Sequence, residues 1–374
     1  MIAWVLGWSL LAQDPLTVFL DFDGGALTHG EDAAQGQVSC VEGSVEYPAY
    51  LGTAAEAAVI TDAVRVAFEP FGIRVVDQAP PPYLPRTTVM IGGHSAPLGV
   101  ADGVNGLACR VDCDDAVPYE TVFVFSETIA SASAVGAIAA HEVGHSLGLE
   151  HVDGAMFVMN GVSTEGGRAF GDSCAPLSER TPTCVSTHAQ HCEGMAQDAT
   201  AELLAVLGPS GAADMPPAIV VHEPVPGAVV VAGTEVVVDI EVTDDHEGVG
   251  WQLREDGLQW ERTMTGSAEP VALQFPEGEF VVVVEAMDQS GQVTTVEIPV
   301  SATRDGRPPP SGGEDTGDDA TTSTPMTADG DTDADPTARE DDAGCRIQAT
   351  GTPAPIWLAM SLGWLAVRRR RYAR

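Results

Sequence analysis

The chain contains no lysine, and arginine supplies all 17 of its basic residues. Aspartate and glutamate together number 55, which gives a formal net charge of −38 at pH 7. This charge excludes binding to nucleic acid or to an anionic lipid surface through bulk electrostatic attraction. Hydrophobic residues make up 44% of the 374 residues and charged residues 19%, which is typical of a globular protein with two or three domains.

Cysteines are few and unevenly placed. Six of the seven precede residue 200, and the seventh, Cys345, stands alone near the end of the chain. Six cysteines in one region indicate up to three disulfides and therefore an oxidising compartment, although their spacing leaves the pairing open. The candidates are Cys40, Cys109, Cys113, Cys174, Cys184 and Cys192.

Both ends of the chain carry features of an exported protein. Residues 1–12 (MIAWVLGWSLLA) form a short apolar run that ends in a small residue, so we predict a secretory signal although the run lacks a basic start. Residues 349–367 are apolar over about 28 Å of helix, close to the roughly 30 Å of a bilayer core. The cluster Arg368–Arg371 follows at once and is expected to keep its own side cytoplasmic.

The order of Cys345, an apolar helix and an arginine cluster within residues 345–374 resembles the myxobacterial C-terminal sorting signal. That resemblance implies processing or lipidation at Cys345 and attachment to the cell surface. A plain single-span membrane anchor is the alternative. Either interpretation predicts an exported protein whose body lies outside the cytoplasm and which meets the membrane through this segment.

Residues 13–208 alternate between strand and helix patterns. Apolar runs and helical spacing predict, in order, one strand, one helix, four strands and a second helix, with a third helix closing the region. The expected ranges are 16–22, 53–68, 73–77, 87–93, 104–112, 121–125, 129–147 and 193–207. This order predicts an α+β domain in which two main helices cover a mostly parallel, twisted sheet. Residues 160–192 show little periodicity, and we expect disulfides to shape them.

A second domain is expected at residues 214–303. Its valine-rich runs alternate with turn dipeptides, which is typical of an antiparallel β-sandwich. The pattern resembles immunoglobulin-like modules, and in particular the bacterial ones without an internal disulfide, because no cysteine occurs in this range. Residues 304–344 are rich in proline, glycine, threonine and aspartate, so we predict a disordered acidic spacer.

The stretch HEVGHSLGLEH at residues 141–151 carries the clearest chemical signal. On a helix, His141 and His145 are four residues apart, so their rings project from one face and both reach a metal at roughly 2 Å. If the helix continued, His151 would lie about 15 Å from His141 along the axis. Gly148 can adopt the left-handed conformation that ends a helix, so we expect the chain to turn back and supply His151 as a third ligand.

Three protein ligands leave a fourth position for water, which is typical of a catalytic zinc site. Glu142 lies next to the ligands on the helix, where it is placed to contact the water rather than the metal. Zinc lowers the pKa of such a water, and a carboxylate then takes its proton and returns it to the leaving amine. The motif therefore predicts one catalytic Zn2+ with Glu142 as the general base.

The five fixed positions of H-E-x-x-H-x-x-G-x-x-H resemble the metzincin zinc endopeptidases. That family has a methionine turn beneath the metal, and Met159 lies eight residues after the last histidine, a spacing like that of the matrixin branch. Met156 competes for the role. The resemblance covers about residues 14–208, and it implies peptide hydrolysis and an antiparallel edge strand around 104–111 that binds substrate in extended form.

A second group of potential ligands occurs near the end of this domain. Cys184, His188, His191 and Cys192 are compatible with a metal cluster. We favour disulfides and ordinary surface histidines, because reduced thiolates are uncommon outside the cell.

Two acidic patterns raise the question of calcium. Asp21 and Asp23 end a predicted strand and open a turn, where acidic residues are common. Asp331, Asp333 and Asp335 precede a proline where a calcium loop needs glycine. Neither pattern supports a calcium site.

We therefore expect a secreted or cell-surface zinc endopeptidase that acts on protein or peptide substrates as a monomer. Two other hypotheses stay open. In the first, the protein is a surface adhesin whose sandwich binds a partner and whose metal domain is inactive, although the intact Glu142 argues against it. In the second, the protein is a zinc hydrolase that cuts a non-peptide amide of cell-wall material.

Overall fold

The structure is a computed structural model. It describes residues 15–30, 32–113, 115–117, 119–161, 169–246, 248–255, 264–265 and 270–308. The predicted signal at 1–12 and the C-terminal segment at 345–374 with Cys345 lie outside the described residues, as does most of the expected spacer. Within the described ranges, no helix combines the length and the apolar composition needed to cross a bilayer.

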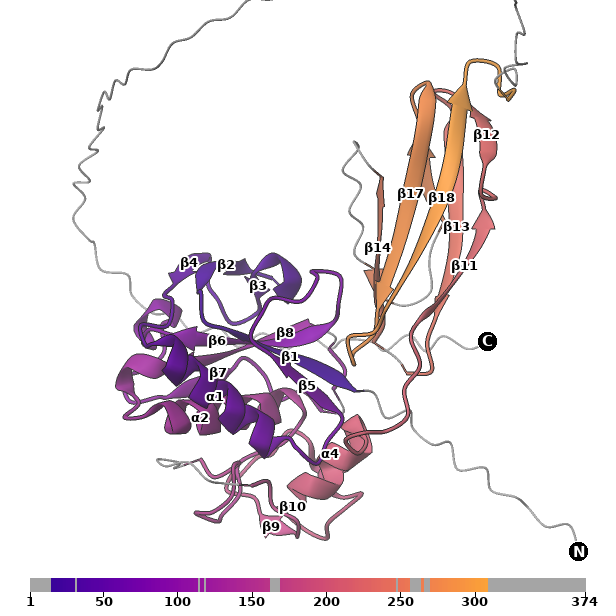
Figure 1. Ribbon diagram of the computed structural model, residues 1–374. Helices are drawn as coiled ribbons and strands as arrows, with labels where there is room; N and C mark the ends of the chain where they lie inside the picture. The colour runs from indigo at the N-terminus through magenta and orange to yellow at the C-terminus, as the bar shows by residue number, and fades with distance from the viewer. Residues whose placement is uncertain are drawn as a thin grey trace, which may run out of the picture. The chain divides into compact units, whose positions relative to one another are not determined.

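A five-stranded sheet organises the first part of the chain (Figure 1). Its strands follow the order β5-β1-β6-β8-β7, and β7 runs antiparallel to β8 while the other pairs are parallel. They are β1 (Leu16–Asp21), β5 (Ile73–Val76), β6 (Arg86–Gly92), β7 (Gly106–Ala108) and β8 (Tyr119–Phe125). Every residue of β6 is buried, because the central strands of a parallel sheet are covered on both faces. The antiparallel strand β7 forms one edge of this sheet.

Two helices, α1 (Ala54–Ala67) and α2 (Ala132–Ser146), pack together on one face of the sheet (Figure 1). Gly136 permits their close approach, since a Cβ at this position would lie 2.6 Å from the Cβ of Ala63. The helices and the sheet share the main core, which includes Val18, Leu20, Ile60, Val64, Val89, Ile91, Val135 and Val143. Helix α2 is therefore buried from Ala134 almost without interruption to its end.

A small three-stranded sheet covers the opposite face (Figure 1). It consists of β2 (Gly25–His29), β3 (Gln37–Val38) and β4 (Ser44–Tyr47), in the order β3-β2-β4. Tyr47 joins it to the main sheet: its ring centroid lies 5.1 Å from that of Phe123, and its hydroxyl donates to the Gly92 carbonyl. Three short 3-10 helices accompany the sheets: η1 (Ala33–Gln35), η2 (Ala96–Leu98) and η3 (Ser126–Thr128).

Short elements build the end of this region. Strand β9 (Ala175–Pro176) pairs with β10 (Ala196–Gln197), α3 (Val185–His188) lies between them in the chain, and α4 (Ala199–Leu207) follows. The expected helix at 193–207 is wrong at its start, because α4 begins only at Ala199. Asp198 caps it by accepting a hydrogen bond from the Ala201 N–H, and the residues just before the cap pair with β9 instead.

All six cysteines that precede residue 200 form disulfides. The pairs are Cys40–Cys109, Cys113–Cys184 and Cys174–Cys192. The first connects the segment between β3 and β4 to the end of β7, and the second connects the segment after β7 to the start of α3. They close loops of 69 and 71 residues, and each is expected to stabilise the fold by about 4 kcal/mol on the chain-entropy account.

The chain from Ala218 to Thr303 forms two β-sheets around a separate core. The sheet orders are β11-β13-β16 and β12-β18-β17-β14-β15, and only the β12–β18 pair is parallel among the described pairings. The strands are β11 (Ala218–Glu223), β12 (Ala228–Val231), β13 (Glu235–Thr243), β14 (Gly250–Glu255), β15 (Met264–Thr265), β16 (Val271–Gln274), β17 (Gly278–Met287) and β18 (Val293–Thr303). Trp251 and Phe275 are the largest side chains of the core, and both are fully buried.

The start of α1 offers a test of this part of the fold. The Thr53 hydroxyl accepts from the Glu56 N–H, and the Glu56 carboxylate accepts from the Thr53 N–H, which is a complete capping box. We expect Thr53→Ala to lower the free energy of unfolding by about 1 kcal/mol, because the cap loses its acceptor. Chemical denaturation measures the change, and Thr53→Ser, which keeps the hydroxyl, should leave stability close to wild type.

Candidate metal centre

Helix α2 delivers the first two histidines of the motif. Ser131 caps the helix by accepting from the Ala134 N–H, and the small residues that follow let α2 pack tightly against α1 and the sheet. His141 and His145 then lie one turn apart on the same face, with ring centroids 4.7 Å apart. Both side chains are buried, so the fold commits two imidazoles to one enclosed place.

The chain turns back directly after the second histidine. Helix α2 ends at Ser146, and Gly148 has φ +88°, a left-handed conformation that glycine adopts without a steric cost. The Gly148 N–H donates to the His145 carbonyl, and the Leu149 N–H donates to the Gly144 carbonyl, which satisfies the end of the helix. The turn brings the third histidine back toward the first two.

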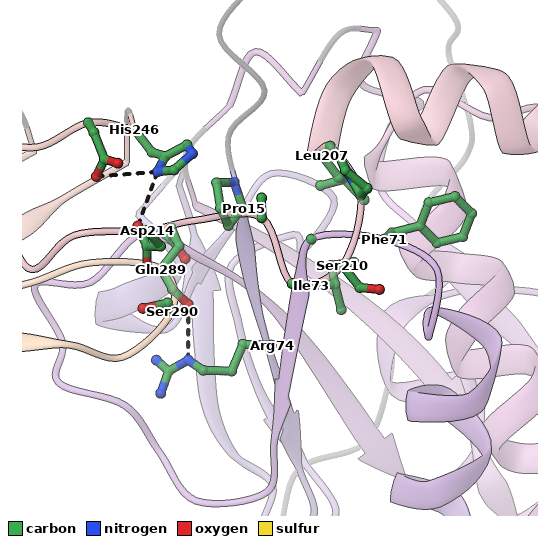
Figure 2. Close-up of a pocket in the computed structure, with 16 residues that line it drawn as sticks. Pro15, Phe71, Ile73, Arg74, Leu207, Ser210, Asp214, His246, Gln289 and Ser290 are labelled. Atoms are coloured by element: carbon green, nitrogen blue, oxygen red, sulfur yellow. Dashed lines mark hydrogen bonds and ion pairs between the residues drawn. The ribbon is translucent and has the colours of Figure 1, made fainter.

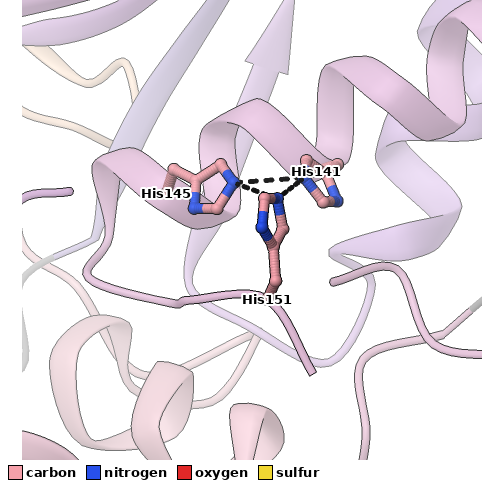
Figure 3. A group of neighbouring side chains, drawn as sticks. All are labelled: His141, His145 and His151. Atoms are coloured by element: carbon pink, nitrogen blue, oxygen red, sulfur yellow. Dashed lines mark hydrogen bonds between the residues drawn. The ribbon is translucent and has the colours of Figure 1, made fainter. Parts of the chain in front are cut away.

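The three rings converge on one point (Figure 3). The Nε2 atom of His151 lies 3.1 Å from that of His141 and 3.2 Å from that of His145, and the Nε2 atoms of His141 and His145 are 3.1 Å apart. Each pair of nitrogens is therefore as close as two ligands of a common ion.

The hydrogen bonds of the Nδ1 atoms fix the tautomers of His141 and His145, the two histidines on helix α2. The Nδ1 atom of His141 is 2.7 Å from the Val158 carbonyl oxygen, and that of His145 is 2.7 Å from the Leu149 carbonyl oxygen. A carbonyl oxygen only accepts, so Nδ1 carries the proton and Nε2 presents a lone pair. Burial, followed by the charges of the other two histidines, lowers the pKa of His145 to about 3, so this ring stays neutral.

Lone pairs that face one another at this distance repel, and a cation between them removes the repulsion. An ion about 2.0–2.1 Å from each nitrogen, the usual length of a metal–imidazole bond, would have N–metal–N angles of about 100° at these separations. The donor set, its tautomers and its spacing thus fit a metal ion. His141, His145 and His151 can hold one.

Glu142 lies beside this centre and contacts the edge strand. Its carboxylate accepts from the Ala108 N–H of β7, and a Cβ at Gly106 would lie 2.3 Å from its Oε1 atom. Glycine at this position therefore makes room for the carboxylate. Burial raises the pKa of Glu142 to about 8, and the hydrogen bond from Ala108 opposes that rise.

The two candidate methionines differ sharply in position. Met159 is fully buried, and its Sδ atom would be 2.5 Å from a Cβ at Gly144, so it packs directly against the helix between the two ligands. Its carbonyl accepts from the Val152 N–H, next to His151. Met156 is 72% exposed and is not part of the packing beneath the histidines.

A cavity of about 370 Å³ opens beside the histidines. It runs between the edge strand β7 and the segment that precedes α3. Its lining consists of Gly106, Leu107, Ala108, Arg110, Val111, Glu142, His145, Glu150, His151, Glu179, Thr181 and Thr183. Two of the three histidines, His145 and His151, therefore face the same cavity as Glu142.

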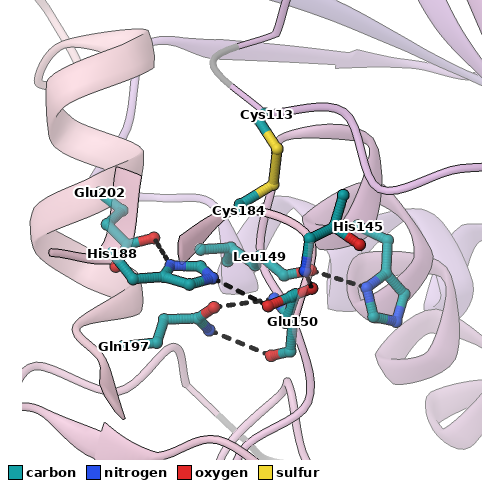
Figure 4. The surroundings of a disulfide bond; sticks show 9 residues. Cys113, His145, Leu149, Glu150, Cys184, His188, Gln197 and Glu202 are labelled. Carbon is teal, nitrogen blue, oxygen red and sulfur yellow. Dashed lines mark hydrogen bonds and ion pairs between the residues drawn. A yellow bond between two sulfur atoms is a disulfide. The ribbon is translucent and has the colours of Figure 1, made fainter. Parts of the chain in front are cut away.

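A buried polar network fixes the position of Glu150, which lies between Leu149 and His151 (Figure 4). The Gln197 side chain accepts from the Glu150 N–H at 2.8 Å and donates to the Glu150 carbonyl at 3.1 Å. The ring of His188 bridges two carboxylates, with Nε2 3.1 Å from Glu150 and Nδ1 2.8 Å from Glu202. The network joins residues up to 52 positions apart, so local sequence patterns did not predict it; the only local signal was a glutamate next to a motif histidine.

The interpretation of His188 as a surface histidine is wrong, because its side chain is 1% exposed. Cys184 and Cys192 belong to two different disulfides, so they do not act as thiolate ligands. Of these four residues, only His188 contributes its side chain to the buried network, and among the described residues no side-chain hydrogen bond of His191 is part of it.

A second group of possible ligands, also absent from the sequence analysis, lies elsewhere. Asp214, Asp244, Asp245 and His246 have side-chain atoms within 4.8 Å of one another. Figure 2 shows the His246 ring in hydrogen-bond contact with the Asp214 carboxylate. Both residues line a cavity of about 530 Å³, which shares no lining residue with the cavity next to the three histidines.

The acidic residues considered as calcium ligands either form a local turn or lie outside the described residues. Asp21 accepts from the Asp23 N–H, so these residues form a local turn. Asp331, Asp333 and Asp335 lie outside the described residues.

Comparison with known proteins gives little further information. No family model matches the chain, and no curated protein matches it. Among solved structures, it is similar to fibronectin(III)-like modules of CbhA from Clostridium thermocellum, with 13% identity over 23% of this chain and 46% of that chain and a TM-score of 0.20. The chain thus spans about half the length of that structure.

Two further similarities are equally distant. The PKD1 domain of Epp from Vibrio anguillarum has 11% identity over 24% of this chain and 96% of that chain, with a TM-score of 0.18. OgpA from Akkermansia muciniphila has 11% identity over 78% of this chain and 92% of that chain, with a TM-score of 0.20. These scores are too low to support an argument about fold or function.

The turn at Gly148 can be tested by substitution. Gly148→Ala should weaken metal binding by at least tenfold, because a side chain at φ +88° costs about 1–2 kcal/mol and the relaxed turn displaces His151. Gly43→Ala is the matched control, since Gly43 has φ +78° and open space around it. Titration of each variant with a metal in competition with a chelator gives the affinities. Equal losses in both variants would contradict a specific role for Gly148.

The His188 network predicts a pH dependence of stability. Burial lowers the pKa of His188, but the hydrogen bonds and charges of Glu202 and Glu150 outweigh it, so the pKa is raised. A raised pKa in the folded state contributes stability that is present at low pH and is lost as the pH rises through that pKa. We expect His188→Gln to destabilise the protein by about 3 kcal/mol at pH 6 and by less at pH 9.

Denaturation of wild type and variant at both pH values measures this difference. His191→Gln serves as the control, since His191 is partly exposed and outside the network. A destabilisation by His188→Gln that does not shrink between pH 6 and pH 9 would exclude the proposed charge pairing.

Proposed function

We propose that the protein is an exported zinc-dependent endopeptidase. The observation that carries the proposal is the convergence of three Nε2 lone pairs within 3.2 Å of one another, beside a buried glutamate and an open cavity. The metzincin-like motif of the sequence supports the same activity. The three disulfides fit an oxidising compartment outside the cytoplasm.

The ligands favour zinc over other common ions. Three neutral imidazoles suit a borderline-soft ion that accepts four ligands, whereas calcium and magnesium prefer oxygen ligands. Three protein ligands leave at least one position for water or substrate. Zinc in such a site lowers the pKa of bound water and polarises a substrate carbonyl.

Glu142 would then move the proton. Its carboxylate lies beside the ligands, is held by the Ala108 N–H and is largely shielded from bulk water. In the reaction, it takes a proton from the attacking water and donates it to the leaving amine.

The edge strand β7 is suited to hold an extended substrate. Among the described strands, β7 pairs only with β8, so its other side can accept a peptide as a further strand except at the Ala108 N–H, which Glu142 occupies. The backbone of Gly106, Leu107 and Ala108 lines the cavity together with Glu142. A peptide added here would pass directly across the metal centre.

The role of Glu142 gives the decisive test. Glu142→Gln should keep about one zinc per chain but reduce casein cleavage by 10²–10⁴-fold, because the amide keeps the shape and cannot act as a base. The measurement combines metal analysis with a protease assay on the full-length protein. His151→Ala is the control and should lose both zinc and activity.

Each alternative function predicts another result. If wild type binds zinc and cleaves no protein, but releases an amide from cell-wall material in a Glu142-dependent way, the substrate class is wrong. If it binds zinc and hydrolyses neither, a binding role becomes the better account. If it binds no zinc, the whole proposal fails.

A further inference from the structure

Glu179 is a carboxylate that contacts His151 through the outer nitrogen of its ring. Its Oε1 atom lies 2.6 Å from the Nδ1 atom of His151 and 3.2 Å from the His151 backbone nitrogen. One oxygen therefore accepts from both the ring and the main chain of the same residue. The other two motif histidines use neutral carbonyl groups of Val158 and Leu149 at this position.

The fold brings Glu179 to this place through a local strand pairing. Val152 and Leu177 form an antiparallel bridge, and the Ser178 N–H donates to the His151 carbonyl at 2.9 Å. The Asp153 N–H donates to the Pro176 carbonyl in the same ladder. The segment that carries Glu179 is thus in register with the segment that carries His151.

Disulfides flank this segment on both sides. Cys174–Cys192 lies just before it, and Cys113–Cys184 lies just after it. These bridges limit the movement of residues 175–183 relative to the rest of the domain. The strand pairing and the two disulfides therefore fix the position of the Glu179 carboxylate.

The second oxygen of Glu179 shows that the contact has a cost. Oε2 is buried and has no hydrogen-bond partner among the described residues. A buried carboxylate oxygen without a donor is unfavourable unless a nearby positive charge compensates it. A cation held by His151 supplies that charge through the ring.

We propose that Glu179 is a positioning residue that orients His151 and strengthens it as the third metal ligand. This inference rests on the metal site of the proposed function. Because the Nδ1–H of His151 donates to the Glu179 carboxylate, the ring is fixed in the tautomer that presents the Nε2 lone pair. The same hydrogen bond makes Nε2 a stronger donor to a metal. In this proposal Glu179 acts on the metal through His151 and is not itself a ligand.

The test measures metal affinity rather than activity alone. Full-length wild type, Glu179→Ala and Glu179→Gln are titrated with Zn2+ in competition with a chromophoric chelator. We expect Glu179→Ala to raise the Kd for zinc by 10–100-fold. Glu179→Gln keeps an acceptor oxygen but loses the charge, so its Kd should lie between the other two.

A control variant and a spectrum separate positioning from general stability. Glu69→Ala removes an exposed carboxylate in the turn after α1 and should leave the Kd unchanged. In 15N-edited 1H NMR of the zinc-loaded protein, the His151 Nδ1–H proton should appear far downfield in wild type and move upfield in Glu179→Gln. A purely structural role would lower unfolding stability without moving this signal.

The outcomes separate this inference from the proposed function. If wild type binds zinc and cleaves casein, but both Glu179 variants bind zinc within threefold of wild type, only the inference is overturned. If Glu179→Ala does not fold, the Kd and the NMR signal of Glu179→Gln decide, and unchanged values overturn it. If wild type binds no zinc, both the inference and the proposed function fail.

Discussion

The turn that ends helix α2 decides whether the three histidines can meet. Two imidazoles on one buried helix face supply only two ligands. His151 can join them as a third ligand only if the chain reverses its direction within six residues. Gly148 makes this reversal possible, and the turn is then held from outside by Gln197 and His188 acting on Glu150. A disulfide at Cys184 anchors the short helix that carries His188.

Electrostatics in the site follows from burial. Removal from water keeps His145 neutral, and the carbonyl acceptors on Nδ1 direct a lone pair toward the centre. The same burial raises the pKa of Glu142. Burial thus shifts both groups toward their neutral forms. The two effects would be lost together if the cavity walls opened to bulk water.

The sequence predicted the features that local periodicity encodes. The strand expected at 16–22 matches β1, and the helix expected at 53–68 with its threonine cap matches α1 to within two residues. The geometry of the three histidines followed from helix spacing and one glycine. The sheet β3-β2-β4 was missed because its strands have two to five residues, too few for a pattern. His188 and Glu179 were missed because their partners are 14 to 38 positions away, where local spacing carries no information.

We propose that one metal ion lies between the three Nε2 atoms. Anomalous diffraction from crystals of the full-length protein, recorded on both sides of the zinc absorption edge, can locate such an ion. We expect a single strong anomalous peak about 2 Å from the Nε2 atoms of His141, His145 and His151. A peak at the Asp214 and His246 cluster alone, or no peak in protein exposed to zinc, would contradict it.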